Sequence, residues 1–414
     1  MSTPVESPAA RDRVEAVLSL IVALIDSGYP TVEAFALGTR AARGLGIGDA
    51  LLIDGGNTIG VQWVTADGEV IARTALASGL GGLNCRNMRQ LSALGKEAAA
   101  GRLDPKSLIS ELADLAARPG PQWWVTTAGM SLLAFAIGLQ VGIGVVPSLT
   151  IAVVQAFVTP LGVIGGRYAV QRVFLCGAQT IAAGLLMALA HLIGVVTWFQ
   201  ATTAIGVPWL LVVPLPILIG MVVDAVNEYP QAAVARLFVV ALGGGGVALG
   251  VFAVMSLGTH LDGATPSSFD LPSLPIALGM FFSVVGAIAN ALANGGARHL
   301  LFPATVVALV TAGVNQFLLH VVGFTPSWSI ICASVVLGLV SAVWSTHSSY
   351  PITVLALLGI TGAILPGLTV YVGIAKTVFG EAGAADFGQA ALTGVGIGVG
   401  VAFGALLATA RERS

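Results

Sequence analysis

Two prolines interrupt apolar spans at matching places in the sequence, in LLVVPLP at residues 210–216 and in GITGAILPG at residues 359–367. Pro214 and Pro366 lie 152 positions apart (366 − 214). Each belongs to the fourth of five apolar spans. Because five is odd, a second copy of the five must enter a membrane in the opposite orientation. Inverted repeats with interrupted helices at corresponding positions are the architecture of secondary transporters.

Charge is distributed very unevenly along the 414 residues. Only 9% of residues are charged and 56% are hydrophobic, whereas soluble chains carry about 25% charged residues. Residues 1–120 hold 11 of the 18 Lys and Arg and 13 of the 20 Asp and Glu, and the other 294 residues (414 − 120) hold only 14 charges. The sequence therefore predicts a soluble domain followed by a membrane domain.

The first 120 residues have the pattern of a small α+β domain. Helical patterns flank three strand-like runs, which are separated by the turn sequences DGGN and ADG. The expected elements are helices at 10–26, 31–44, 86–101 and 105–117 and strands at 50–54, 58–65 and 69–74.

The rest of the chain carries ten apolar segments. Each is long enough to cross a hydrocarbon core of roughly 30 Å. The sequence therefore predicts an α-helical polytopic membrane protein with ten transmembrane helices. They lie at 122–144, 147–165, 171–196, 203–223, 234–257, 272–292, 300–322, 327–346, 351–375 and 389–410.

Basic residues assign an orientation to these spans, because cytoplasmic loops carry an excess of Lys and Arg. If residues 1–120 are cytoplasmic, 17 of the 18 basic residues lie on the cytoplasmic side and only Lys376 lies outside. The opposite orientation reverses this count. We therefore expect a multi-pass protein of the cell membrane with both termini in the cytoplasm.

The second five spans repeat the spacing of the first. Adding 152 to the first five starts gives 274, 299, 323, 355 and 386, against expected starts at 272, 300, 327, 351 and 389. Glycine runs at 243–250 and 394–400 occupy the fifth span of each copy. The predicted organisation is a domain at 1–120 and inverted five-helix repeats at 121–257 and 258–414. The glycines allow close helix packing, either within one chain or between copies in a homo-oligomer.

The proline breaks predict where a substrate binds. Pro214, Pro216 and Pro366-Gly367 free backbone groups that must find partners or line a cavity. A broken helix offers its N-terminal end to a carboxylate and its carbonyl end to an ammonium, the two charged groups of an amino acid. The alternative at each break is a packed kink without a ligand. Asn315 and Gln316 form the densest polar pair within the spans, and we expect further substrate contacts there.

Asp224 and Glu228 lie one helical turn apart at the end of span four. An ionisable residue at depth in a membrane costs about 3 kcal/mol, so it usually has a role, and burial would raise its pKa. One interpretation is a proton-coupling site. The other is a solvated loop carboxylate that pairs with Arg236.

The sequence predicts no cofactor and no metal site. Cys85, Cys176 and Cys332 are scattered, and the chain has no CxxC, HExxH, GxSxG or Walker motif. A net charge of −2 gives no basic face for nucleic acid. We expect a protein that is not an enzyme. Two other classes stay open: a membrane-anchored hydrolase with residues 1–120 as the catalytic unit, and a structural or regulatory membrane protein.

Several short motifs, in their order, resemble the threonine/serine exporter family, ThrE. The segment SGYPTVE at 27–33 is similar to that family's opening helix signature. Pro214, Asp224 and Arg236 match its Pro-x9-Asp-x11-Arg spacing. The C-terminal LPG at 365–367 with Tyr371 resembles its Pro-Gly segment. The resemblance extends over nearly the whole chain and implies export of small amino acids in exchange for protons, with a soluble domain of hydrolase descent.

Two departures from the family pattern border the expected site. Leu215 and Pro216 follow the first proline where the family has Gly, and Glu228 and Ala233 stand where glycines are expected. The substrate can therefore differ from threonine and serine. We expect partners of three kinds: a small zwitterionic substrate, protons and the lipid bilayer. The expected substrate residues are Pro214, Pro216, Pro366, Gly367, Tyr371, Asn315 and Gln316, and the expected proton-coupling residues are Asp224 and Glu228.

Overall fold

The structure is a computed structural model that divides the chain into two compact units. The first comprises residues 1–120, 216–239 and 345–354, and the second comprises 121–215, 240–344 and 355–414. The first unit therefore combines the N-terminal residues with two segments from the apolar part of the chain. The residues described are 8–77, 83–118, 120–213, 215–258, 274–364, 369, 372–373, 376–377 and 381–413.

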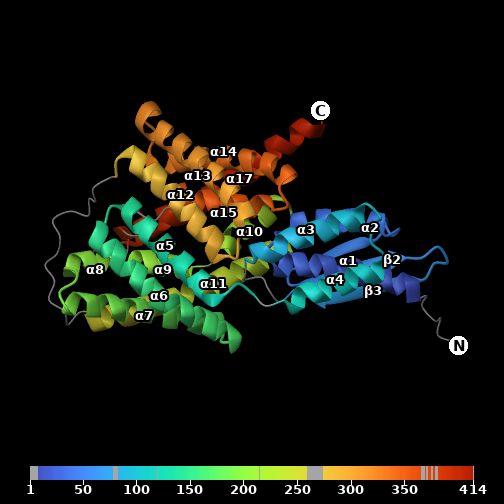
Figure 1. Ribbon diagram of the computed structural model, residues 1–414, viewed down its shortest axis with the longest axis horizontal. Helices are drawn as coiled ribbons and strands as arrows, with labels where there is room; N and C mark the ends of the chain where they lie inside the picture. Colours follow the sequence, from blue (N-terminus) through green and yellow to red (C-terminus); the bar gives the residue numbers. More distant parts are fainter. Residues whose placement is uncertain are drawn as a thin grey trace. The chain divides into compact units, whose positions relative to one another are not determined.

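The N-terminal part of the first unit contains four helices and a small sheet (Figure 1). Each element overlaps the one expected from the sequence. The elements are α1 (Pro8–Asp26), α2 (Thr31–Gly44), β1 (Leu51–Gly55), β2 (Thr58–Val64), β3 (Val70–Leu76), α3 (Cys85–Ala99) and α4 (Pro105–Ala117).

The sheet is antiparallel in the order β1-β2-β3. Its inner face presents Ile59, Val61 and Ile71, all at most 1% exposed, and α1 packs against β2 and β3. The β1–β2 turn is closed by Gly56, whose φ is +83° and whose N–H donates to Asp54 Oδ1 at 2.9 Å. Glycine is favoured there because it adopts positive φ without a steric penalty.

The apolar part of the chain is helical. Its elements are α5 (Trp123–Val141), α6 (Val145–Arg167), α7 (Arg172–Leu192), α8 (Trp198–Ala204), α9 (Gly206–Val212), α10 (Leu215–Val226), α11 (Pro230–Gly258), α12 (Ile276–Ala293), α13 (Arg298–Phe317), η1 (Leu318–Val322), α14 (Pro326–His347), α15 (Ile352–Gly359), η2 (Ile360–Ile364) and α17 (Ala384–Arg413).

Among the described residues, eight helices are long and apolar enough to cross a membrane, or nine if the bent pair formed by Trp198–Val212 and Leu215–Val226 counts as one span. The chain is therefore a polytopic membrane protein. The expected ninth span is present as a shorter apolar helix at Ile352–Ile364, and most of its predicted remainder lies outside the described residues. The total of ten spans stays a prediction.

The expected interruption of span four is confirmed at the helix boundaries. Helix α9 ends at Val212, Val213 is extended with ψ 130°, and α10 begins at Leu215. Val213 precedes Pro214 in the sequence, and a residue before proline is driven out of the α region by the proline ring. Pro216 is the second residue of α10, where a missing N–H costs no helical hydrogen bond.

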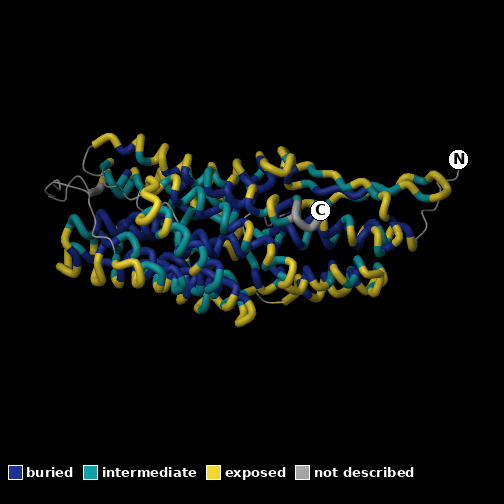
Figure 2. Tube along the Cα trace, turned by 90° about the horizontal axis from the view of Figure 1, so that it is seen from above, coloured by how far each residue is buried: buried dark blue, intermediate teal, exposed yellow. Residues whose placement is uncertain are grey.

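Exposed residues recur along the membrane helices beside buried ones (Figure 2), and many of the exposed residues are apolar. On α6 they follow a helical spacing of three and four residues, so they form one stripe along the helix. Such a stripe suits contact with lipid. Its members are Val146, Leu149, Val153, Phe157, Leu161 and Ile164.

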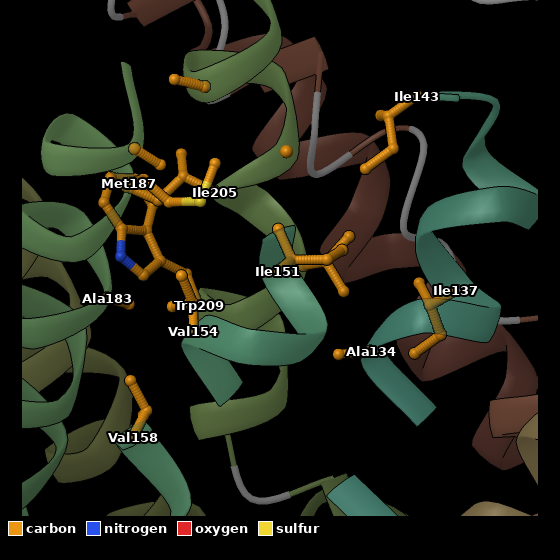
Figure 3. Packing of buried hydrophobic residues seen from close by; sticks show 14 of the residues in the cluster. Ala134, Ile137, Ile143, Ile151, Val154, Val158, Ala183, Met187, Ile205 and Trp209 are labelled. Atoms are coloured by element: carbon orange, nitrogen blue, oxygen red, sulfur yellow. The ribbon is translucent and has the colours of Figure 1, made fainter. Parts of the chain in front are cut away.

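The opposite sides of these helices form a buried core within the second unit (Figure 3). Trp209 of α9 is 2% exposed, and its indole Nε1 donates to Thr180 O of α7 at 3.0 Å. The ring lies among Val154 of α6, Met187 of α7 and Ile205, which follows α8. The first half of span four is therefore held in an apolar environment.

Glycines bring the third and fifth helix of each predicted repeat into backbone contact. A Cβ on Gly246 of α11 would overlap Val173 O of α7. A Cβ on Gly404 of α17 would overlap Val335 O of α14, and one on Gly338 of α14 would overlap Val401 O of α17. Small residues at such crossings let helix backbones approach closely in membranes. The same pair of helices is thus joined in the same way in both halves.

We predict that Gly246→Ala lowers the thermal unfolding midpoint of the detergent-purified protein. The added methyl group meets a backbone oxygen that cannot rotate away, and overpacking costs roughly 1–3 kcal/mol. Gly245→Ala is the matched control, because nothing lies within 4 Å of its added Cβ. Alanine favours a helix by about 1 kcal/mol over glycine, so the control should keep or raise the midpoint. Equal midpoints in the two variants would contradict the close contact between Gly246 of α11 and Val173 of α7.

Candidate functional site: a junction of buried carboxylates

Asp224, near the end of α10, caps a helix from a distant part of the chain. Its side chain is fully buried. Oδ1 accepts from the backbone N–H of Thr31 at 2.8 Å, and Oδ2 accepts from Thr31 Oγ1 at 3.1 Å. Thr31 is the first residue of α2, and Pro30 before it has no capping side chain. Asp224 thus satisfies an N–H that the helix itself leaves without a partner.

Arg236 of α11 completes this contact. Its Nε donates to Asp224 Oδ2 at 2.8 Å, and its Nη2 donates to Tyr29 O at 2.8 Å. Arg236 is 2% exposed, so the pair is shielded from water. Gly220 of α10 leaves room for the guanidinium, since a Cβ there would lie 3.0 Å from Nη1. The two motifs at 27–33 and 224–236 therefore meet in space.

Two further carboxylates cap helices in the same way. Glu33 of α2 accepts from the N–H of Ile352, the first residue of α15, at 3.3 Å through Oε2. Asp54 of the β1–β2 turn accepts from the N–H of Ala232, in the first turn of α11, at 3.2 Å through Oδ2. A negative charge at a helix N-terminus is stabilised by the helix dipole. We call the residues that make these contacts the cap junction: Tyr29, Thr31, Glu33, Asp54, Asp224, Ala232, Arg236 and Ile352.

Glu33 is the carboxyl group of the junction that titrates near neutrality. Burial raises its pKa from 4.5 to about 7, and the charge of Asp224 adds to this, while backbone N–H groups of Ile352 and Thr353 oppose it. Burial dominates because it removes the water that stabilises the ionised form. Tyr29 beside it has a raised pKa for the same reason. Sequence reasoning did not single out Glu33 as functional, although it belongs to the segment at 27–33.

The two interpretations of Asp224 and Glu228 separate here. The pairing of Asp224 with Arg236 is confirmed, and the expectation that Asp224 is solvated is wrong, because α2 covers it. Glu228 is exposed in the turn between α10 and α11 and has φ +65°. Burial therefore gives no support to a role for Glu228 in proton coupling.

A second polar cluster surrounds the π-helical turn η2 in the second unit. Gln140 of α5 donates from Nε2 to Gly362 O at 2.9 Å. Asn290 of α12 donates from Nδ2 to Thr361 Oγ1 at 2.9 Å. In an α-helix the acceptor Gly362 O would pair with the N–H of residue 366, which is proline and has none. A polar side chain from another helix gives this carbonyl a partner, and we call these four residues the η2 cluster.

Asn315 and Gln316 lie in α13 and have different surroundings. Asn315 Oδ1 accepts from Ser329 Oγ of α14 at 2.6 Å, so it serves a contact between helices. Gln316 Oε1 is buried and has no hydrogen-bond partner among the described residues. Asn290 and Gln140 were not chosen from the sequence as substrate residues. Proline at 366 signals that a carbonyl one turn earlier needs another donor, but nothing in the local sequence identifies Gln140 as that donor.

Four of the expected substrate residues lie outside the described residues: Pro214, Pro366, Gly367 and Tyr371. Pro216 lies in the first turn of α10. Among the described residues, no group of three or more His, Cys, Asp or Glu side chains is arranged to hold a metal ion. The cap junction and the η2 cluster are thus two polar centres within the part of the chain that the structure describes.

The fold and these two centres define a polytopic membrane protein with interrupted apolar helices and a buried carboxylate junction. A model of the family described as "Putative threonine/serine exporter" matches residues 15–258, which include the whole cap junction except Ile352. The chain belongs to this threonine/serine exporter family, ThrE. No curated protein and no solved structure matches the chain with significance.

We predict that Arg236→Met strongly destabilises the protein. The substitution leaves the Asp224 carboxylate buried without its counter-ion, and breaking one partner of a buried pair costs about 3–5 kcal/mol. The measurement is the thermal unfolding midpoint in detergent. Adding Asp224→Asn to Arg236→Met should recover part of the loss, since no buried charge then remains.

The control for this prediction is Arg102→Met, which removes one partner of the exposed pair with Glu97. An exposed pair is screened by water and salt, so the midpoint should not move measurably. An equal shift in Arg236→Met and Arg102→Met would show that burial of the first pair has no energetic consequence.

Proposed function

We propose that this chain exports small amino acids of the threonine and serine type from the cytoplasm by exchange for protons. Its ten spans would form two inverted five-helix repeats, with residues 1–120 and both termini in the cytoplasm of the cell. Membership of the exporter family supports transport of this substrate class. The observation that carries the proposal is the η2 cluster, where the backbone carbonyl of Gly362, four positions before Pro366 in the sequence, is bound by a polar side chain from the other half of the chain.

Equivalent helix packing in the two halves supports the repeat. Helices α7 and α11 meet through Gly246, and helices α14 and α17 meet through Gly338 and Gly404. These are the third and fifth helices of each five-span copy. Helices α5 and α12, the first of each copy, also pack closely, because a Cβ on Gly129 would lie 2.8 Å from Ala289 O. Two copies related by a two-fold axis in the membrane plane would place their equivalent helices in contact in this manner.

The η2 cluster suits a small hydroxylated zwitterion. Amide groups both donate and accept hydrogen bonds, so Gln140 and Asn290 can bind a carboxylate, an ammonium or a hydroxyl group. The cluster has no charged side chain, which fits a substrate with no net charge. The broken helices at Pro214, Pro216, Pro366 and Gly367, with Tyr371, Asn315 and Gln316, remain the proposed further lining of the site.

The proton motive force is sufficient for such export. At about 150 mV one inward charge supplies roughly 3.5 kcal/mol, and each 1.4 kcal/mol corresponds to a tenfold gradient. One proton per substrate therefore supports a gradient of a few hundred-fold. The hydrolase alternative gains no support from the N-terminal domain, whose Glu33 and Asp54 are used as helix caps.

We predict that Gln140→Leu reduces kcat/KM for threonine about 10- to 100-fold, because one substrate-facing hydrogen bond is worth about 1–3 kcal/mol in a buried site. The assay is uptake of labelled threonine into inverted vesicles. Gln179→Leu is the matched control: Gln179 also donates to a backbone carbonyl of another helix, Val158 O, at 3.2 Å. If both variants change KM equally, the η2 cluster is a packing contact. Absence of transport of every small amino acid by the wild type would refute the exporter itself.

We predict that Asp224→Asn abolishes the dependence of threonine transport on a pH gradient if Asp224 binds the coupled proton. The amide keeps an acceptor for the N–H of Thr31 but cannot change its charge. The measurement is threonine accumulation in inverted vesicles with and without an imposed gradient. Unchanged dependence on the gradient in Asp224→Asn would remove Asp224 from the coupling path.

A further inference from the structure

Helices α10 and α15, which both take part in the cap junction, lie next to the interruptions of the predicted spans four and nine. Helix α10 begins directly after the break at Val213, and α15 runs into the η2 turn. In the proposed orientation, span four ends in the cytoplasm and span nine begins there. Helices α10 and α15 are then the cytoplasmic halves of the two interrupted spans, and we call them the inner halves.

One five-residue segment of the N-terminal domain binds both inner halves. Thr31 binds Asp224 of α10 through its N–H and its hydroxyl group. Glu33 binds the N–H of Ile352 at the start of α15. Tyr29 adds its carbonyl to Arg236, which holds Asp224 from the other side. The segment Tyr29–Glu33 therefore joins two helices that are 126 positions apart in the sequence (352 − 226).

The boundaries of the two compact units also fall within these two interrupted spans. The first unit contains residues 216–239 and 345–354 together with the N-terminal domain. Its boundaries cross the spans next to the break before α10 and within α15, before the η2 turn. The inner half of span four, and the start of the inner half of span nine, thus belong with the domain rather than with the remaining membrane helices.

We propose that the Tyr29–Glu33 segment positions the inner halves of both interrupted spans as a single cytoplasmic gate, with Glu33 as the positioning residue that holds or releases the start of α15. This inference rests on the proposed function, since a gate has meaning only in a transporter. It gives the N-terminal domain a direct part in the transport cycle. Neither the carboxyl group of Glu33 nor the segment contacts the substrate; both act through the helices they hold.

Protonation of Glu33 favours the docked state. Buried against α15 the carboxyl has a pKa of about 7, against 4.5 when hydrated. The docked form thus binds its proton more tightly. The contribution of this proton to the stability of the docked state is complete below pH 4.5. It is lost as the pH rises to about 7, and above that pH both the docked and the released forms are ionised. Rising pH therefore favours release of α15. The charged and titratable groups that surround Glu33 and its neighbour Tyr29 are Asp224, Arg236, Tyr350 and Cys85.

The thiol and phenol groups among these neighbours do not titrate near neutral pH. Burial raises the pKa of Cys85 to about 12, and the pKa values of Tyr29 and Tyr350 are raised as well. An acid cytoplasm would then keep the gate closed. Such a response limits proton entry through an exporter that exchanges its substrate for protons.

The test is amide hydrogen exchange at residues 352–354 of the full-length protein in detergent, corrected for the intrinsic effect of pH. In the wild type, the equilibrium constant for release of the start of α15 should rise on the order of 100-fold between pH 5 and pH 8. Glu33→Gln keeps an oxygen for the Ile352 N–H and cannot ionise, so its opening should stay low at both pH values. Glu33→Asp keeps a carboxyl group and should retain the pH response. Glu111→Gln, at an exposed site of the same domain, should behave as the wild type.

A second measurement tests whether the Tyr29–Glu33 segment holds both α10 and α15. Arg236→Met loosens the contact with α10 and should also raise exchange at 352–354, whereas Arg102→Met should not. A pH response that persists in Glu33→Gln overturns the role of Glu33. Unchanged exchange at 352–354 in Arg236→Met overturns the proposal that one segment positions both α10 and α15.

Transport separates this inference from the proposed function. At equal pH on both sides, wild-type threonine exchange should increase from pH 6 to pH 8, and Glu33→Gln should give a flat profile with an unchanged KM. A wild type that transports no small amino acid refutes the proposed function, while the exchange measurement still decides whether Glu33 controls α15. A Glu33→Gln variant that transports with the wild-type pH profile refutes the gate alone.

Discussion

Carboxylates that cap helices from elsewhere in the chain are the interaction on which the first compact unit depends. Helix N-termini carry N–H groups that no residue of the helix can satisfy, and burying them without an acceptor is costly. At the cap junction, Asp224, Glu33 and Asp54 supply acceptors to α2, α15 and α11 in turn. Each cap is supplied by one part of the chain and received by another. Within the first unit, these caps join the N-terminal domain to the ends of the apolar helices.

The capping carboxylates are not equivalent. Asp224 is matched by Arg236, so its charge is compensated within the protein. Glu33 has no cation bound to it by an ion pair among the described residues, and backbone N–H groups alone offset its burial. A buried carboxyl group without a counter-ion lowers its free energy by taking up a proton. This difference makes the contact between Glu33 and α15 dependent on pH.

The two interrupted spans are stabilised by different means. Before the break in span four, Trp209 lies in an apolar core and donates to Thr180 O. At η2 in span nine, Gln140 binds the carbonyl of Gly362, and Asn290 binds Thr361. The first half of span four thus lies among apolar groups, whereas the η2 turn lies beside amide groups.

Sequence alone determined the features that depend on local pattern. The apolar segments, the turns of the N-terminal domain, the break at Val213 and the pairing of Asp224 with Arg236 at a separation of 12 residues follow from composition, proline chemistry and helical spacing. The total of ten spans, the inversion of the repeat and the substrate residues at 214, 366, 367 and 371 stay predictions. One of the two interpretations of Asp224 placed it at a solvated end of a helix, because nothing local shows what covers a helix terminus.

Only the tertiary structure decided which partner each polar group meets. Thr31 and Asp224 are 193 positions apart, and Glu33 and Ile352 are 319 apart. A capping carboxylate leaves no periodic trace in the sequence, because a single acceptor at the right place is sufficient. Burial then sets the charge state of Glu33, since its pKa depends on the water that the whole fold removes. The sequence thus specifies the helices and their interruptions, and the long-range contacts specify which of their ends are held together.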